Sequence, residues 1–167
     1  SADRDPLRNA GIISQRLEPA AVVSLDPPFM SGFSPPAGKN QEIRDNRILA
    51  GCVFSRREAH IDPFGGLSLC PAIKDPALRY DLRQGSVREG WEEFIPGLAD
   101  KVRGTEVFRK NCGACPLREE CRWCPAYGYL EHGDPSSPVE HLCAIARESR
   151  RYEQEWLARN RRFYQTG

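Results

Sequence analysis

Hydrophobic and polar positions alternate most clearly in the stretch "REAHIDPFGGLSLC", near the middle of the chain. Ala59 and Ile61 fall on one side of an extended segment, and Leu67 and Leu69 alternate along the return segment. The Pro-Phe-Gly-Gly sequence between the two segments supplies turn residues. The pattern therefore predicts a β-hairpin over this stretch.

A helical pattern follows in "SVREGWEEFI". Ser86 and Glu89 stand three residues apart, as the two partners of a capping box do. The apolar residues fall on one helical face and are Val87, Trp91, Phe94 and Ile95. A second helix is predicted within "GLADKVRGTEVFRK".

The strongest helical pattern lies at the C-terminal end of the chain. Ser137 is the predicted N-cap, Pro138 suits the first turn and Glu140 completes a capping box. An apolar stripe continues along the helix through Leu142, Ile145, Tyr152 and Trp156. Arginines alternate with glutamates on the remaining positions, which predicts a solvated face rather than a basic binding patch.

The first fifty residues have a different composition, with no cysteine and many prolines and glycines. A strand is predicted from Ala21 to Leu25, leading into the loop "LDPPFMSGFSPPAGKN". The sequence thus predicts an N-terminal segment over residues 1–50 and a domain over residues 51–167. The expected fold class is α+β, with a small hairpin, a loop-rich helical region and a long C-terminal helix.

Charge and hydropathy exclude several classes of function. The 167 residues include 24 Lys and Arg and 23 Asp and Glu, so no global field favours nucleic acid or an anionic membrane. Apolar runs are too short for a transmembrane helix or a signal-peptide core. A cytoplasmic protein is expected.

Seven cysteines carry the chemistry, and four of them lie within "CGACPLREECRWC". Disulfide anchors, a redox dithiol, zinc ligands and iron–sulfur ligands are the alternatives. A secreted disulfide framework favours an even number of cysteines, and a redox dithiol uses one C-x2-C pair after a strand. Metal-bound thiolates in a reducing compartment fit the odd count and the paired spacing better.

The spacings read C-x12-G-x4-C from Cys52 through Gly65 to Cys70, then C-x2-C-x5-C-x2-C from Cys112 to Cys124, then Cys143. This order resembles the SPASM domain, the C-terminal auxiliary-cluster domain of radical SAM enzymes that modify peptides and proteins. The resemblance covers about residues 51–147 and includes "IDPFGGLSLC", "LRQGSVREGWEEF" and "CPAYGYLEHG". One spacing departs from the family: two residues separate Cys121 from Cys124, where the family usually has three.

The resemblance implies two clusters with interleaved ligands. One [4Fe–4S] cluster would be held by Cys112, Cys115, Cys121 and Cys143. The other would be held by Cys52, Cys70 and Cys124, as an incompletely ligated [4Fe–4S] cluster or a [2Fe–2S] cluster. Its open iron would take water, substrate or a side chain, and His60 and Asp62 near the hairpin are the candidates.

Zinc is the alternative occupant, since C-x2-C pairs build common four-cysteine structural sites. The function would then be that of a zinc-stapled interaction domain with no redox role. The chain has no C-x3-C-x2-C motif for a SAM-cleaving cluster, so the resemblance implies no catalysis by the chain alone. It implies instead electron transfer or substrate engagement beside a radical SAM barrel, as a domain or a partner protein, with a peptide or protein substrate.

Overall fold

The computed structural model describes residues 5–27, 48, 52–53, 58–118 and 120–164, and these residues divide between two packed units. The helical unit contains the described residues of 5–27, 115–123 and 138–164. The hairpin unit contains those of 48–114 and 124–137. The two units interleave along the chain. The predicted division into residues 1–50 and 51–167 stays a prediction.

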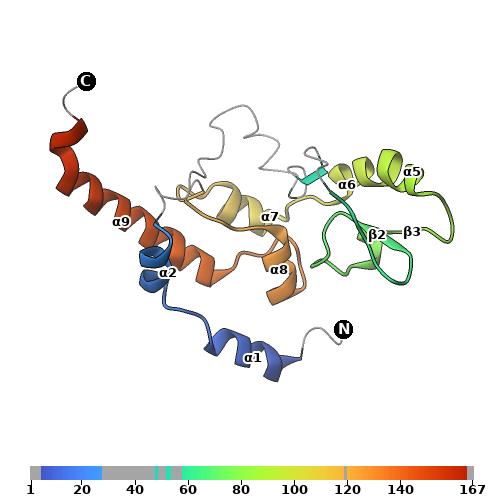
Figure 1. The fold of residues 1–167 in the computed structure, drawn as a ribbon, viewed down its shortest axis with the longest axis horizontal. Coiled ribbons are helices and arrows are strands. Elements are labelled where there is room, and N and C mark those ends of the chain that lie inside the picture. The colour runs from blue at the N-terminus through green and yellow to red at the C-terminus, as the bar shows by residue number, and fades with distance from the viewer. Residues whose placement is uncertain (1–4, 28–47, 49–51, 54–57, 119, 165–167) are drawn as a thin grey trace. The chain divides into compact units, whose positions relative to one another are not determined.

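The helical unit is built from α1 (Pro6–Ser14), α2 (Pro19–Leu25) and α9 (Glu140–Tyr164). The Asp5 carboxylate caps α1 by accepting a hydrogen bond of 2.9 Å from the Leu7 N–H. Helix α2 lies beside α9 (Figure 1), and its Val23 is buried.

The strand predicted from Ala21 to Leu25 is wrong, because this segment is helix α2. Pro19 occupies the first turn, where its fixed φ suits a helix and its missing N–H leaves no bond unmade. The short apolar run packs along α9, and periodicity alone does not separate a buried helix from a buried strand over so few residues.

The long C-terminal helix is confirmed, but it begins at Glu140 and not directly after a Ser137 cap. The Val139 carbonyl accepts the first helical hydrogen bond, 3.1 Å from the Cys143 N–H. The Ser137 hydroxyl donates to Asp134 at 3.4 Å. The predicted apolar stripe is half-buried, and the buried positions among the described side chains of this helix are Ala146 and Ser149.

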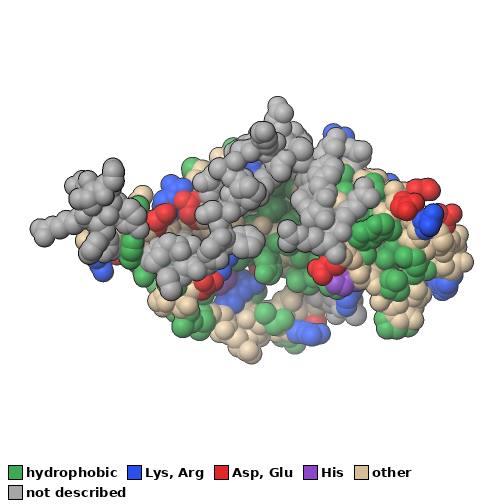
Figure 2. All heavy atoms as spheres, turned by 45° about the horizontal axis from the view of Figure 1, so that its top comes forward, with side chains coloured by type: hydrophobic (Ala, Val, Ile, Leu, Met, Phe, Trp, Pro, Cys, Tyr) green, Lys and Arg blue, Asp and Glu red, His purple; other side chains and the backbone are tan. Residues whose placement is uncertain are grey.

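Ion pairs occupy the solvated face of α9, as the alternating charges predict. Arg151 pairs with Glu148 and Glu155, and Arg159 pairs with Glu155 at 3.5 Å. On the face shown in Figure 2, basic and acidic side chains lie in small mixed groups. Exposed pairs of this kind contribute little to stability. No helix within the described residues has the length and apolar character that crossing a bilayer requires.

The hairpin unit contains a three-stranded antiparallel sheet in the order β1 (His60–Ile61), β2 (Gly66–Ser68) and β3 (Arg79–Asp81). Ile61 pairs with Leu67, which confirms the predicted hairpin. The third strand was not predicted, because three residues without apolar alternation give no strand signal. It follows the short helix η2 (Pro76–Leu78), and its Tyr80 pairs with Leu67.

The hairpin turn is fixed by Asp62. Its carboxylate accepts hydrogen bonds from the N–H groups of Phe64, at 2.8 Å, and Gly66, at 2.9 Å. Gly65 has φ +84°, in the left-handed region that glycine adopts without a steric penalty. Asp62 also forms an ion pair with Arg79 on β3, so the turn and the third strand are held together.

A continuous helical stretch follows the sheet as α5 (Val87–Glu89), η3 (Gly90–Phe94) and α6 (Ile95–Lys101). The predicted capping box is confirmed: the Ser86 hydroxyl accepts from the Glu89 N–H at 3.2 Å, and the Glu89 carboxylate accepts from the Ser86 N–H at 2.6 Å. On the predicted apolar face, Ile95 is buried but Val87 is exposed. The predicted second helix corresponds to α6 together with α7 (Glu106–Phe108) and η4 (Arg109–Gly113).

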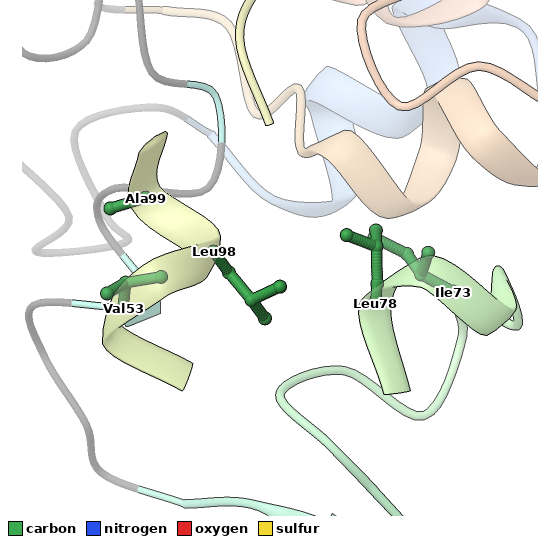
Figure 3. Packing of buried hydrophobic residues seen from close by; sticks show 5 residues of the cluster. All are labelled: Val53, Ile73, Leu78, Leu98 and Ala99. Atoms are coloured by element: carbon green, nitrogen blue, oxygen red, sulfur yellow. The ribbon is translucent and has the colours of Figure 1, made fainter. Parts of the chain in front are cut away.

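The core of the hairpin unit is one apolar cluster, shown in Figure 3. Leu98 points from α6 toward Leu78 and Ile73 at the opposite side of the cluster. Ala126 and Tyr129 pack against the cluster from α8 (Pro125–His132), a helix that was not predicted. The sequence signals for α8 were Pro125 in its first turn and Gly133 directly after its last residue. In the structure Gly133 has φ 77° and ends the helix.

The predicted α+β class, with a small antiparallel sheet and a long C-terminal helix, is confirmed. Most of the predicted proline-rich loop, residues 28–40, lies outside the described residues.

Candidate metal centres

Three of the predicted ligands lie in the hairpin unit. Cys52 is on a short helical turn, Cys70 follows strand β2 and Cys124 directly precedes helix α8. The Cys52 thiol is within electrostatic range of both other thiols, and Cys124 is within range of Cys70. The fold thus brings together three cysteines that are up to 72 positions apart, the difference between 52 and 124.

The thiol-bearing residues Cys52 and Cys70 line one small cavity of about 20 Å³, which has room for about one water molecule. Its other walls are apolar and are formed by Leu69, Ile73, Leu78 and Leu98. These walls belong to the core cluster of the unit, or pack against it. A cluster held here would be shielded from water on its protein side, which is one of the factors that set the potential of an iron–sulfur centre.

Cys52 is exposed as a residue, but partial desolvation raises the pKa of its thiol, and negative charge on Cys124 and Cys70 raises this pKa further. Burial also raises the pKa of Cys124, although the backbone N–H groups of Ala126 and Tyr127 face this sulfur and favour its thiolate. These thiols are therefore poor nucleophiles without a metal, and metal binding must release their protons.

A second group of cysteines lies in the helical unit and consists of Cys115, Cys121 and Cys143. Cys121 is within electrostatic range of both others. Burial raises the pKa of Cys121, while the backbone N–H of Trp123 favours its thiolate. Cys143 lies in the first turns of α9, as predicted, and Cys115 and Cys121 bound the loop that precedes Trp123.

Cys112 lies on η4, in the hairpin unit, two residues before the chain passes into the helical unit. The resemblance places it with Cys115, Cys121 and Cys143. That placement of Cys112 stays a prediction.

The structure contains no disulfide bond between any of the seven cysteines, all of which are described residues. Within the described part of the chain, no three His, Cys, Asp or Glu side chains form a group that could hold one metal ion.

The two non-cysteine candidates for the open iron, Asp62 and His60, differ in the contacts that the structure gives them. Asp62 binds the hairpin turn and pairs with Arg79, so its carboxylate is already engaged. His60 lies on β1, half-buried and in register with Ser68.

Sequence reasoning missed the contact between Arg150 and Glu120, the residue that precedes Cys121 in the chain. Arg150 was assigned to the solvated face of the last helix. The structure instead pairs it with Glu120, whose side chain is 13 % exposed. The seven-residue spacing from Cys143 places both side chains on one helical face, but it does not indicate which loop residues Arg150 binds.

Comparisons with known proteins give one informative similarity. No family model matches the chain, and no solved structure matches it. Over 95 residues, 53% of this chain, the sequence is 30% identical to a PqqA peptide cyclase of Methylocella silvestris. The aligned part is 25% of the cyclase, so this chain matches about a quarter of the length of that relative. The chain is therefore similar over about half of its length to part of an enzyme that cyclises a peptide.

Proposed function

We propose that this chain is the auxiliary iron–sulfur module of a radical SAM system that modifies a peptide or protein. The observation that supports it best is that six of the seven cysteines fall into two groups whose thiols interact electrostatically. Cys121 interacts with Cys115 and Cys143, while Cys124 interacts with Cys70 and Cys52. For these six cysteines the grouping agrees with the interleaved assignment that the SPASM resemblance implies, and the similarity to part of a PqqA peptide cyclase supports a peptide-modifying role.

In this proposal each group of thiols holds one cluster. Cys52, Cys70 and Cys124 hold the first, which keeps an iron without a cysteine ligand. Cys115, Cys121 and Cys143 hold the second, with Cys112 as its fourth ligand. The donor set fits, since cysteine thiolates are the usual ligands of [4Fe–4S] and [2Fe–2S] clusters.

The bound clusters would supply one-electron transfer and an open iron for a peptide group. The residues of the chain set the conditions for that chemistry. The N–H groups that face Cys121 and Cys124 favour thiolate over thiol, and hydrogen bonds to cluster sulfurs raise or lower reduction potentials. The apolar wall beside Cys52 and Cys70 limits access of water.

The partner in the proposal is a radical SAM barrel, as another domain or as a separate protein, and the substrate is a peptide. The chain contains no C-x3-C-x2-C motif of its own to bind the SAM-cleaving cluster. The barrel would generate the substrate radical, and this module would engage the peptide or accept its electron.

The test is anaerobic reconstitution of the full chain with iron and sulfide, followed by metal analysis and EPR of the reduced protein. Two clusters predict about eight irons per chain and a brown protein. A colourless protein that retains one or two zinc ions and takes up no iron contradicts the proposal and favours the zinc-stapled interaction domain.

A further inference from the structure

We propose that Arg150 is the positioning residue of the centre formed by Cys115, Cys121 and Cys143, holding the cysteine loop against helix α9. The identity of the metal at this centre rests on the proposed function. The positioning itself is argued from contacts within the helical unit.

Arg150 and Cys143 lie on the same helix, seven residues apart, which is close to two turns. Their side chains therefore leave α9 from the same face. The other two cysteines of the group are not on this helix. Their placement relative to Cys143 needs a contact that joins their loop to α9.

Arg150 makes that contact twice. Its Nη2 donates a hydrogen bond of 2.9 Å to the carbonyl oxygen of Pro116, the residue that follows Cys115. Its Nε donates to the carboxylate of Glu120, the residue that precedes Cys121. One guanidinium thus binds the loop at both ends, each time next to a cysteine.

Arginine suits this position because its planar fork presents donors in several fixed directions. Lysine carries the same charge, but its point-like ammonium does not reproduce the planar fork. The Glu120 side chain is largely buried, and its second carboxylate oxygen has no hydrogen-bond partner among the described residues. Loss of Arg150 would take away the cation that neutralises this carboxylate, which is costly for a buried ion.

The experiment uses the full chain with four versions of α9: wild type, Arg150→Gln, Arg150→Lys and the control Arg151→Gln. Arg151 pairs with Glu148 and Glu155 on the solvated face of the same helix. The first measurement is the alkylation rate of each cysteine in the reduced chain before reconstitution, followed by mass spectrometry. This measurement needs no metal, so it judges Arg150 even if the iron–sulfur proposal fails.

In Arg150→Gln, alkylation of Cys115 and Cys121 should rise by about tenfold, as expected when a hydrogen-bonded charged group is removed. Cys70 and Cys124, in the hairpin unit, should react at wild-type rates and serve as internal controls. In Arg150→Lys, the alkylation rates of Cys115 and Cys121 should lie between those of wild type and Arg150→Gln. In Arg151→Gln, these rates should match those of wild type. Wild-type rates for Cys115 and Cys121, or an equal rise at all four cysteines, would overturn the positioning role.

The second measurement is the reduction potential of each centre in the reconstituted chain, with the centres distinguished by Cys143→Ser. Arg150→Gln should shift only the potential of the centre that contains Cys143, because hydrogen bonding and net charge around a cluster set its potential. If Arg150→Lys keeps the wild-type reduction potential of this centre, the positive charge alone is enough to set that potential. This result would overturn the claim that the planar fork of Arg150 positions the loop.

Discussion

Cys121 and Cys124 are separated by only two residues, yet their thiols interact with different sets of cysteines. Cys121 interacts with Cys115 and Cys143 in the helical unit, and Cys124 interacts with Cys52 and Cys70 in the hairpin unit. The chain passes from one unit to the other between Trp123 and Cys124. The short "CRWC" segment, with one residue fewer than the SPASM pattern, spans this boundary.

The first prediction follows from this separation. Cys124→Ser should remove the centre shared with Cys52 and Cys70 and leave about four irons in the other centre. Cys143→Ser should do the converse, because its neighbours are Cys121 and Cys115. Iron content and EPR of the two reduced variants, prepared side by side, give the measurement.

The two variants serve as controls for each other. If both substitutions abolish the same EPR signal and spare the same remaining one, Cys124 and Cys143 share a centre. The interleaved assignment is then wrong, and Cys52 and Cys70 need ligands from outside the seven cysteines.

A second prediction compares two glycines within one helical stretch. A Cβ at Gly90 would lie 2.3 Å from Leu67 Cδ2 and 3.0 Å from Tyr80 Cδ1, and Leu67 is 2 % exposed. Gly90→Ala should therefore destabilise the chain by about 1–3 kcal/mol, the usual cost of overpacking. A Cβ at Gly97 meets no atom within 4 Å, so Gly97→Ala should stabilise by up to about 1 kcal/mol through helix propensity. Urea unfolding measures both, and equal effects of the two substitutions would contradict the close contact.

The third prediction concerns acid stability. The Asp81 carboxylate accepts two hydrogen bonds of 2.8 Å from the Arg83 guanidinium, which lowers the pKa of Asp81 from 3.8 to about 2. A carboxyl group with a lowered folded-state pKa stabilises the fold above its unfolded pKa and loses that contribution as the pH falls through the folded value. The stability difference between wild type and Asp81→Asn should therefore be full at neutral pH and shrink between about pH 4 and pH 2. Thermal unfolding across this range measures it. A difference that stays constant down to pH 2 rules out the linkage.

A fourth prediction tests the capping box. Ser86→Ala removes the hydroxyl that accepts from the Glu89 N–H, and loss of such a cap costs about 0.5–2 kcal/mol. The matched control is Ser24→Ala, because Ser24 is an exposed helical serine whose hydroxyl donates to the Ala21 carbonyl at 2.8 Å. That substitution should be neutral or slightly stabilising, since alanine has the higher helix propensity. Denaturant midpoints of the two variants give the comparison. Equal losses of stability in the two variants would mean that the capping box does not stabilise the fold.

Local signals in the sequence predicted those elements that depend on neighbouring residues. The hairpin follows from Asp62, Gly65 and the alternating leucine at position 67, all within a few positions of the turn. The capping box of Ser86 and Glu89 is equally local. For helix α2, which packs against a distant partner, the prediction failed. Helix α2 was assigned as a strand because its packing against α9 joins segments more than a hundred residues apart.

The candidate centres show the same limit. The spacing of the cysteines and the SPASM resemblance predicted two sets of ligands, with Cys121 in one set and Cys124 in the other, and this assignment stays a prediction. Neither could predict Arg150, since its acceptors Pro116 and Glu120 become neighbours only after α9 packs against the cysteine loop. The sequence of a helix does not indicate which loop a charged side chain on that helix will bind.

The interleaving of the two units also sets an order for synthesis on the ribosome. The hairpin unit is complete once Ser137 has emerged, and by then Cys52, Cys70 and Cys124 are all available. The helical unit is complete only after α9 has emerged, although α1 and α2 are made before the hairpin unit. During that interval Cys115 and Cys121 lack Cys143. The two sets of thiols therefore become complete one after the other during synthesis, the hairpin set first.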